Sequence, residues 1–168
     1  MPARVRLERP TLRAAAEFLA AVHRSRKLHA PWVKAPSTEA AYRDFVRRVR
    51  MPTHIGYLIR LRSSGELVGV AGISEIVRGS LCSAYLGYYA FAPHERQGLM
   101  TEGLSLVIKQ AFGPLRLHRL EANVQPGNRT SLGLIRRLGF RREGLSPRYL
   151  KIRGRWRDHE RWALLADG

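Results

Sequence analysis

The residues with the most evident chemical potential form a short loop, Glu95–Met100, between an aromatic segment and an amphipathic one. The aromatic segment, Tyr85–Phe91, has the composition of a strand, and Gly87 within it suits close approach of a ligand. From Thr101 onward, apolar residues recur at helical spacing up to a Gly-Pro stop, which predicts a helix over Thr101–Phe112. The first N–H groups of a helix have no intrahelical partner and lie at its positive end. The loop is therefore predicted to bind an anion, and a pyrophosphate suits it.

One glycine, Gly98, stands in this loop, so it matches neither the GxGxxG dinucleotide fingerprint nor the P-loop. A basic loop before a helix also occurs as a plain strand–helix connection. The rest of the chain has to decide between these two interpretations.

Composition points to anionic partners. The 168 residues include 30 Lys and Arg against 13 Asp and Glu, a formal charge of +17, with 45% hydrophobic residues. This length and hydrophobic content predict one globular domain over residues 1–168. The charge favours nucleic acid, the ribosome, a membrane surface or a polyanionic cofactor. The alternative is a solvated basic surface without a specific partner.

Cysteine and histidine usage argues against a metal site. Cys82 is the one cysteine, and the six histidines show no HExxH-type pairing, so neither a disulfide framework nor a metal is expected. The sequence shows no signal peptide and no apolar run of membrane-spanning length. These features predict a soluble, cytoplasmic protein without a membrane partner.

Periodicity and turn residues predict the elements that position the loop. Four helices are expected: one after Pro10-Thr11 with an apolar stripe to Val22, one capped by Ser37 or Thr38, and Thr101–Phe112 and Arg129–Leu138. Asn128 is expected to N-cap the last of these and Gly139 to close it. Strands are expected at Val5–Leu7, His54–Leu61, Leu67–Val77, a fourth segment that ends at Phe91, His118–Val124, Phe140–Gly144, Arg148–Ile152 and Trp156–Leu165. Strand His118–Val124 should run parallel to the one ending at Phe91, because a helix connects them.

The ordered set of motifs resembles the GNAT acetyltransferase superfamily. GYYAFAPHERQGLMTEGL, LHRLEANVQPGN, the NxxS of Asn128 and Ser131, RLGFRREG and GRWRDHERWAL together resemble its Rim branch, the ribosomal-protein-alanine N-acetyltransferases. The likeness extends over essentially the whole chain. The superfamily loop is often Q/R-x-x-G-x-G/A, whereas Glu95 and Met100 stand at its first and last positions here.

The resemblance implies an α+β fold, a GNAT-type twisted mixed sheet flanked by helices. It places an acetyl-CoA site where strands four and five splay apart. It further implies direct transfer of acetyl to a primary amine, most simply the α-amine of a protein N-terminus. The cofactor contacts expected are Tyr89, Ala90, Phe91, Arg96, Gln97, Gly98, Leu99, Met100, Thr101, Asn128 and Ser131.

The same resemblance suggests catalytic and acceptor residues. Ser131 is the candidate acid for the departing thiolate, or else a helix-terminal hydroxyl bonded to backbone. Glu121 is a candidate base, with an arginine ion pair as its alternative, and Tyr88 could border the acceptor cleft or simply be packed. Trp32 and Glu75 are candidates to contact the acceptor, although a tryptophan at the position of Trp32 more often covers the core.

Two other functions are compatible with these residues. One is acetylation of a small amine or an antibiotic, and the other is a non-catalytic module that binds CoA or RNA. Ribosome association through the basic surface is expected to be salt-dependent. The chain could be a monomer or a homodimer.

Overall fold

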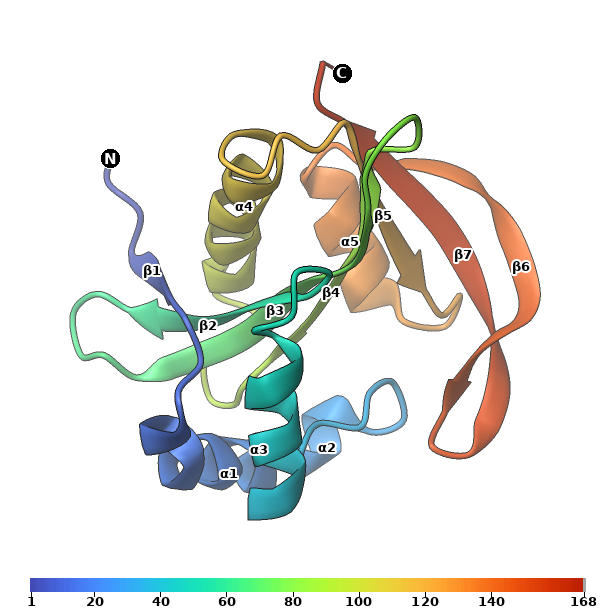
Figure 1. Cartoon of the computed structure of the whole chain (residues 1–168). Helices are drawn as coiled ribbons and strands as arrows, with labels where there is room; N and C mark the ends of the chain where they lie inside the picture. The colour runs from blue at the N-terminus through green and yellow to red at the C-terminus, as the bar shows by residue number, and fades with distance from the viewer. Residues whose placement is uncertain (168) are drawn as a thin grey trace.

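The computed structural model describes residues 1–167, folded into seven strands and a set of short helices (Figure 1). The elements in chain order are β1 (Val5–Glu8), the 3-10 turn Leu12–Ala14, α1 (Ala15–Arg24), α2 (Arg26–His29), α3 (Glu39–Arg48), β2 (Ile55–Leu61), β3 (Leu67–Val77), β4 (Ser83–Ala90), α4 (Leu99–Phe112), β5 (Arg119–Val124), α5 (Arg129–Arg137), β6 (Arg141–Ile152) and β7 (Arg155–Leu165).

All seven strands form one mixed sheet in the order β1-β2-β3-β4-β5-β7-β6. Neighbouring strands are antiparallel except β4 and β5, which run parallel, as the connecting helix predicted. The expected α+β architecture, a mixed sheet flanked by helices, is confirmed.

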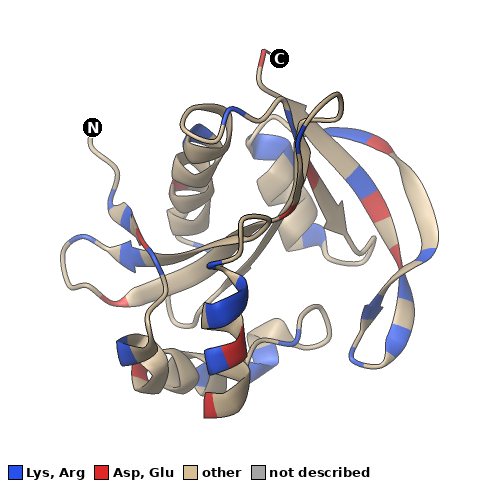
Figure 2. Ribbon diagram, viewed as in Figure 1, with Lys and Arg blue, Asp and Glu red and all other residues tan. Residues whose placement is uncertain are grey.

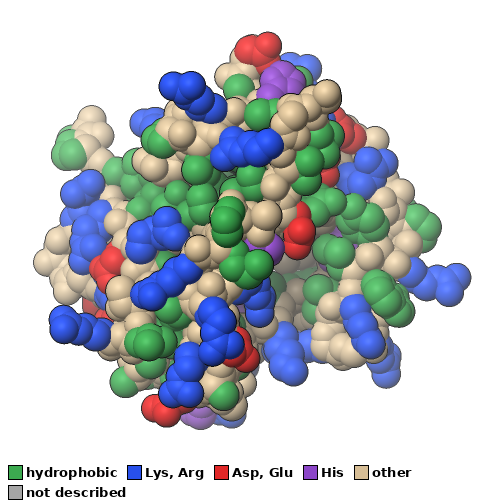
Figure 3. Space-filling model, viewed as in Figure 1, with side chains coloured by type: hydrophobic (Ala, Val, Ile, Leu, Met, Phe, Trp, Pro, Cys, Tyr) green, Lys and Arg blue, Asp and Glu red, His purple; other side chains and the backbone are tan. Residues whose placement is uncertain are grey.

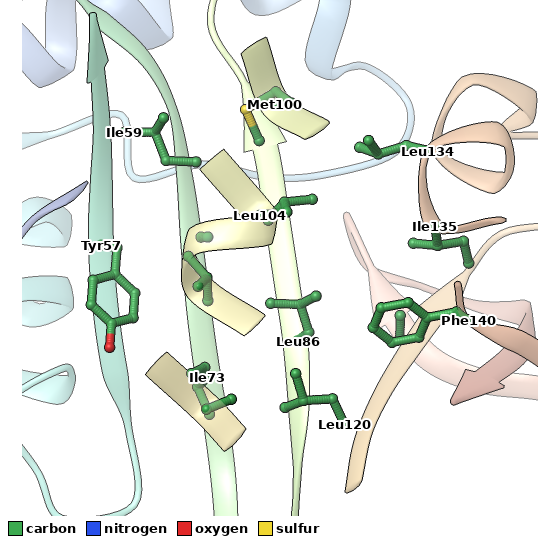
Figure 4. Packing of buried hydrophobic residues seen from close by; sticks show 14 of the residues in the cluster. Tyr57, Ile59, Ile73, Leu86, Met100, Leu104, Leu120, Leu134, Ile135 and Phe140 are labelled. Atoms are coloured by element: carbon green, nitrogen blue, oxygen red, sulfur yellow. The ribbon is translucent and has the colours of Figure 1, made fainter. Parts of the chain in front are cut away.

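Alternating side chains give each face of the sheet its own core. On β2, Tyr57 and Ile59 join the apolar cluster beneath α4 and α5, whereas Leu58 joins the cluster containing Phe18 of α1 and Tyr42 of α3. In Figure 1 the helices α4 and α5 accordingly lie on one side of the sheet and α1–α3 on the other. Figure 4 shows the first cluster, in which side chains from the strands meet those of α4 and α5.

Helix α4 approaches the sheet closely because it carries a glycine at the contact. A Cβ on Gly103 would come within 2.7 Å of Ile59 Cδ1. The absence of a side chain at that position lets the α4 backbone pack directly against Ile59 of β2.

Local predictions were confirmed at several helix ends. Thr38 Oγ1 accepts a hydrogen bond from Ala41 N–H at 3.1 Å, and Asn128 Oδ1 accepts one from Ser131 N–H at 3.2 Å. These are the N-caps of α3 and α5. Gly139 follows α5 with φ 92°, the left-handed conformation expected after a helix.

Two boundaries were predicted wrongly. Helix α4 begins at Leu99, two residues before Thr101, because Gly98 adopts φ 75° and the helix starts directly after it. The strands expected at Phe140–Gly144 and Arg148–Ile152 form the single strand β6. Its register against β7 shifts between Ser146 and Leu150, and this irregularity carries the strand past Pro147.

None of the helices within residues 1–167 is both long enough and apolar enough to cross a membrane.

Candidate active site

The site lies where β4 and β5 separate. Their parallel pairing covers Ser83–Tyr85 and Arg119–Glu121 and ends there. Beyond Tyr85, β4 continues to Ala90 in pairing with β3, so its β5-facing edge is open. An open strand edge presents free backbone donors and acceptors to a ligand.

Strand alternation determines which backbone groups are open. Phe91 N–H donates to Val68 C=O at 2.7 Å, so the backbone of Phe91 faces β3. Because successive residues of a strand point their N–H and C=O groups to opposite sides, Tyr88 and Ala90 face the gap. His29 Nε2 lies 2.7 Å from Ala90 C=O, which leaves Ala90 N–H and both backbone groups of Tyr88 facing the gap.

Helix α4 begins at the same gap. Its first intrahelical bond runs from Glu102 N–H to Gly98 C=O, so the N–H groups of Leu99, Met100 and Thr101 have no intrahelical acceptor. A Cβ on Gly98 would meet Arg4 Nη2 at 3.5 Å and no other atom within 4 Å. The helix start is therefore open, with its positive end directed outward.

A cavity of about 210 Å3, here called the loop cavity, connects the helix start with the open edge of β4. The cavity is lined by most of the predicted cofactor residues: Tyr89, Ala90, Arg96, Gly98, Met100, Thr101, Asn128 and Ser131. Three predicted contacts do not line it. The Gln97 side chain donates to Pro93 C=O at 3.1 Å, and Leu99 and Phe91 are buried in the two cores.

Charge in the loop cavity is mixed. Arg96 and Arg137 line it, and Glu95 does too. Glu95 Oε2 is buried and has no hydrogen-bond partner within residues 1–167. An anion at the helix start would thus meet two guanidinium groups and the helix dipole, with one carboxylate nearby.

Tyr88 and Ser131 come together across the gap. The Tyr88 hydroxyl and Ser131 Oγ are 2.6 Å apart, which joins β4 to the first turn of α5. Burial raises the pKa of Tyr88 to about 12, although the hydrogen bond with Ser131 acts in the opposite direction. Tyr88 is therefore a protonated phenol at neutral pH, and the pair can hold and pass a proton.

A second, larger cavity of about 690 Å3 lies on the other side of the gap, against α3, and is here called the α3 cavity. Ala41 and Phe45 of α3, the segment after Trp32, and Gly87 of β4 line it. Figure 3 shows the surface hollowed between the α3 side and the β6–β7 hairpin. Trp32, Val33, Tyr88 and Tyr89 line both cavities, so the two cavities meet at these residues.

The segment carrying Trp32 is held over this junction from two sides. Gln125 Nε2 donates to Trp32 C=O at 3.2 Å, and Arg153 Nη2 donates to Val33 C=O at 3.0 Å. The Trp32 ring also lies 3.2 Å from where a Cβ of Gly127 would stand. Trp32 thus lies at the junction of the two cavities, and its contact with an acceptor stays a prediction.

Two predicted site residues lie elsewhere. Glu121 Oε1 accepts from Arg119 Nε at 2.9 Å, the ion pair that was its alternative interpretation. Glu75 is exposed, with His54 Nε2 3.5 Å from its Oε1. Neither residue lines the loop cavity or the α3 cavity.

Some site residues escaped sequence reasoning. His29 is buried against the ring of Tyr89, with ring centroids 5.1 Å apart, and burial lowers its pKa. Arg4 Nη2 donates to Gln97 C=O at 2.9 Å, a contact between segments far apart in the chain that no local pattern announces. The i, i+4, i+7 spacing of Thr130, Leu134 and Arg137 on α5 would have predicted a shared helix face toward the loop cavity.

Comparison with known proteins agrees with this geometry. The model of the acetyltransferase (GNAT) domain matches residues 4–141. The chain belongs to the GNAT acetyltransferase family. Several relatives within that family carry named activities.

A probable N-acetyltransferase of Bacillus subtilis, YjcK, is 35% identical over 122 residues, which cover 73% of this chain and 67% of that protein. The [ribosomal protein uS5]-alanine N-acetyltransferase of Escherichia coli is 43% identical over 99 residues, 59% of this chain and 51% of that protein. This chain therefore matches only about half the length of that enzyme. Among solved structures, Mycobacterium smegmatis RimJ in complex with CoA-disulfide superimposes with a TM-score of 0.89 at 29% identity, covering 97% of this chain and 82% of that one.

Proposed function

We propose that this N-acetyltransferase transfers acetyl from acetyl-CoA to the N-terminal α-amine of a protein, with ribosomal proteins as the first candidates. The observation that carries the proposal is that two cavities meet at Tyr88 and Tyr89: the loop cavity beside the open start of α4, and the larger α3 cavity. The similarity to enzymes named for ribosomal-protein alanine acetylation supports this choice of acceptor.

The residues of the loop cavity fit acetyl-CoA. The free N–H groups of Leu99–Thr101 and the guanidinium groups of Arg96 and Arg137 would hold the pyrophosphate. The open edge of β4 at the backbone of Tyr88 would pair with the amides of the pantetheine arm. When bound there, acetyl-CoA supplies an acetyl group activated as a thioester.

A backbone N–H facing the gap would stabilise the thioester carbonyl oxygen as negative charge develops on it. Ala90 N–H is the candidate, since its own C=O is fixed by His29 at 2.7 Å. This bond holds the backbone of the edge in place before the substrates arrive.

The Tyr88–Ser131 pair would return a proton to the departing sulfur. Ser131 Oγ lines the loop cavity and lies 2.6 Å from the Tyr88 hydroxyl. As Ser131 donates its proton to the thiolate, Tyr88 donates to Ser131, and the proton that the attacking amine releases to solvent would return Tyr88 to its protonated form. Tyr88 is protonated over the whole physiological pH range because burial raises its pKa to about 12.

The acceptor amine has to lose a proton, and the junction offers little help with this. Trp32, Val33, Tyr88 and Tyr89, which line both cavities, carry no carboxylate. An α-amine has a pKa of about 8, against about 10.4 for lysine, so roughly a tenth of it is already free base at neutral pH. A junction without a carboxylate is thus better suited to a protein N-terminus than to a lysine side chain.

The α3 cavity also favours a peptide over a small cationic amine. Its charged lining residues are Lys34, Arg48 and Asp44 within residues 1–167, and Asp44 Oδ1 lies 3.3 Å from Arg47 Nη1. A polyamine or an aminoglycoside would meet a net positive surface there. An extended peptide needs no acidic pocket.

A panel of amines tests the acceptor class. We expect turnover of a peptide with a free N-terminal alanine and at least about 100-fold lower kcat/KM for the same peptide with a blocked N-terminus and an internal lysine. Spermidine and an aminoglycoside serve as small-amine comparators. Preferred turnover of either comparator would overturn the proposal. Mass spectrometry of ribosomal proteins after incubation with the enzyme and acetyl-CoA would then identify the acceptor N-terminus.

A further inference from the structure

The far end of the β6–β7 hairpin concentrates positive charge. Residues 148–157, here called the hairpin tip, contain five cations and no carboxylate: Arg148, Lys151, Arg153, Arg155 and Arg157. In Figure 2 the part of the hairpin farthest from the chain ends carries Lys and Arg colouring, whereas acidic residues lie nearer its base. Both strands of the tip are largely exposed to solvent.

The charges of the tip are not neutralised by the protein. At the base of the hairpin, Arg142 Nε pairs with Glu160 at 2.9 Å, and Arg119 pairs with Glu143. Within residues 1–167, no ion pair involves a cation of the tip, and Arg153 uses its guanidinium on Val33 C=O. Asp158, just beyond the tip, accepts from the backbone N–H of Arg148 at 2.8 Å.

An exposed indole stands among these cations. Trp156 is 59% exposed, whereas Trp162, on the same strand, is 5% exposed. Trp156 lies opposite Lys151 in the β6–β7 register. An exposed indole offers a flat face on which a planar group such as a nucleic-acid base can stack.

The acceptor site does not account for Trp156. Ile152 and Arg155 form the next cross-strand pair, and Ile152 lines the α3 cavity. Since adjacent pairs of a ribbon point to opposite faces, Trp156 and Lys151 face away from that cavity. Trp156 lines neither the α3 cavity nor the loop cavity.

We propose that the hairpin tip binds single-stranded RNA, with Trp156 stacking on a base and the cations of the tip contacting phosphates. By strand alternation Lys151 lies on the same face as Trp156, whereas Arg155 and Arg157 lie on the opposite face, so phosphates would be contacted from both faces of the ribbon. An aromatic platform within a basic surface is the combination by which proteins bind single strands. A protein surface of mixed charge fits less well, because the hairpin tip has no carboxylate with which the basic residues of such a surface could pair. This inference goes beyond acetyl transfer and does not rest on the identity of the acceptor amine.

The test measures binding of a fluorescently labelled single-stranded oligouridylate by anisotropy over a series of salt concentrations. Trp156→Ala should weaken binding by about 5- to 150-fold, the range expected for loss of one stacked base. Lys151→Glu together with Arg157→Glu should lower the slope of log affinity against log salt by about 1.4, since each phosphate contact on a single strand contributes about 0.7. Quenching of tryptophan fluorescence by the oligonucleotide should disappear in Trp156→Phe.

A matched control changes the same charge elsewhere. Arg13 and Lys109 are exposed and make no side-chain contact with an acidic residue within residues 1–167, so Arg13→Glu with Lys109→Glu should keep most of the wild-type affinity. An equal loss in this control would mean that overall charge, and not the tip, binds RNA, and would overturn the proposal. Unchanged binding by Trp156→Ala, or equal affinity for a duplex of the same length, would overturn the stacking role.

Acetylation of a free acceptor peptide separates this proposal from the proposed function. All hairpin-tip variants should acetylate the peptide with wild-type kcat/KM, because the substituted side chains line neither cavity. Failure of the wild type to acetylate any peptide would count against the proposed acceptor and leave the RNA measurement valid.

Discussion

Removing the two hydroxyls of the Tyr88–Ser131 pair, singly and together, tests the proton relay. Ser131→Ala deletes the group that would reach the sulfur, and general acid catalysis of this kind contributes about 100-fold or more, or about 2.7 kcal/mol of transition-state stabilisation. Tyr88→Phe keeps the buried ring and deletes a hydrogen bond of 2.6 Å. Its loss should cost about tenfold in kcat, about 1.4 kcal/mol, because Ser131 can then draw a proton from water.

The double variant gives the decisive number. Without Ser131 the Tyr88 hydroxyl has no role in the relay, so Tyr88→Phe in the Ser131→Ala background should cause no further loss. The coupling energy should then equal the whole effect of Tyr88→Phe, about 1.4 kcal/mol. Steady-state kcat and KM for acetyl-CoA and for an acceptor peptide are measured for all four proteins, with thermal unfolding to confirm folding.

The pH profile provides an independent check on the same relay. Burial raises the pKa of Tyr88 to about 12, so the acid stays protonated and kcat/KM should rise with pH to a plateau set by the acceptor amine near pH 8. Additive losses in the two single variants would show that the hydroxyls act independently. If Ser131→Ala raised the KM for acetyl-CoA and left kcat unchanged, Ser131 would be a binding residue and the relay would be refuted.

Two further perturbations address the helix start and the strand edge. Gly98→Asp should weaken acetyl-CoA binding about 100-fold, measured by calorimetry, because it places a carboxylate beside the proposed phosphate site. Gly98→Ala introduces the same backbone strain at φ 75° without the charge, so it should lose much less affinity. Equal losses in the two variants would remove the electrostatic argument. Burial lowers the pKa of His29, so below about pH 6.5 the unfolded chain binds more protons than the folded one. The stability of the protein therefore decreases as the pH is lowered through this range. Thermal unfolding of His29→Gln, which can still donate to Ala90 C=O, should show a weaker dependence over that range, and an unchanged dependence would assign the effect to other groups.

Sequence patterns predicted those parts of the fold that depend on short-range spacing. The apolar stripe of α4, the parallel placement of β5 and the Asn128 cap follow from periodicity and local hydrogen bonding, and all three were found. The start of α4 was missed because it depends on the left-handed conformation of Gly98, which the neighbouring residue types do not predict. Pro147 in β6 resembles a strand break, and the register shift that accommodates it becomes visible only with β7 beside it.

Site residues divide along the same line. Arg96, Gly98 and Thr101 belong to one contiguous loop and helix start, so the loop motif located them together. Arg4 and His29 reach the site through contacts with segments distant in sequence, and their types alone carry no signal. Glu121 sits two residues from Arg119 on the same face of β5, and this nearby cation decides between its two interpretations.

The gap between β4 and β5 explains why one strand can serve both substrates. Because side chains alternate along β4, Tyr88 reaches Ser131 on the α5 side of the sheet, while Tyr89 packs against His29 on the other side, with burial raising the pKa of both phenols. Both residues nevertheless line both cavities, since no neighbouring strand covers that edge. Transfer through the sheet therefore needs no movement of a substrate around its edge. The end of the β4–β5 pairing at Tyr85 and Glu121 leaves this edge uncovered, so the backbone pairing, and not a single side chain, lets the two cavities meet.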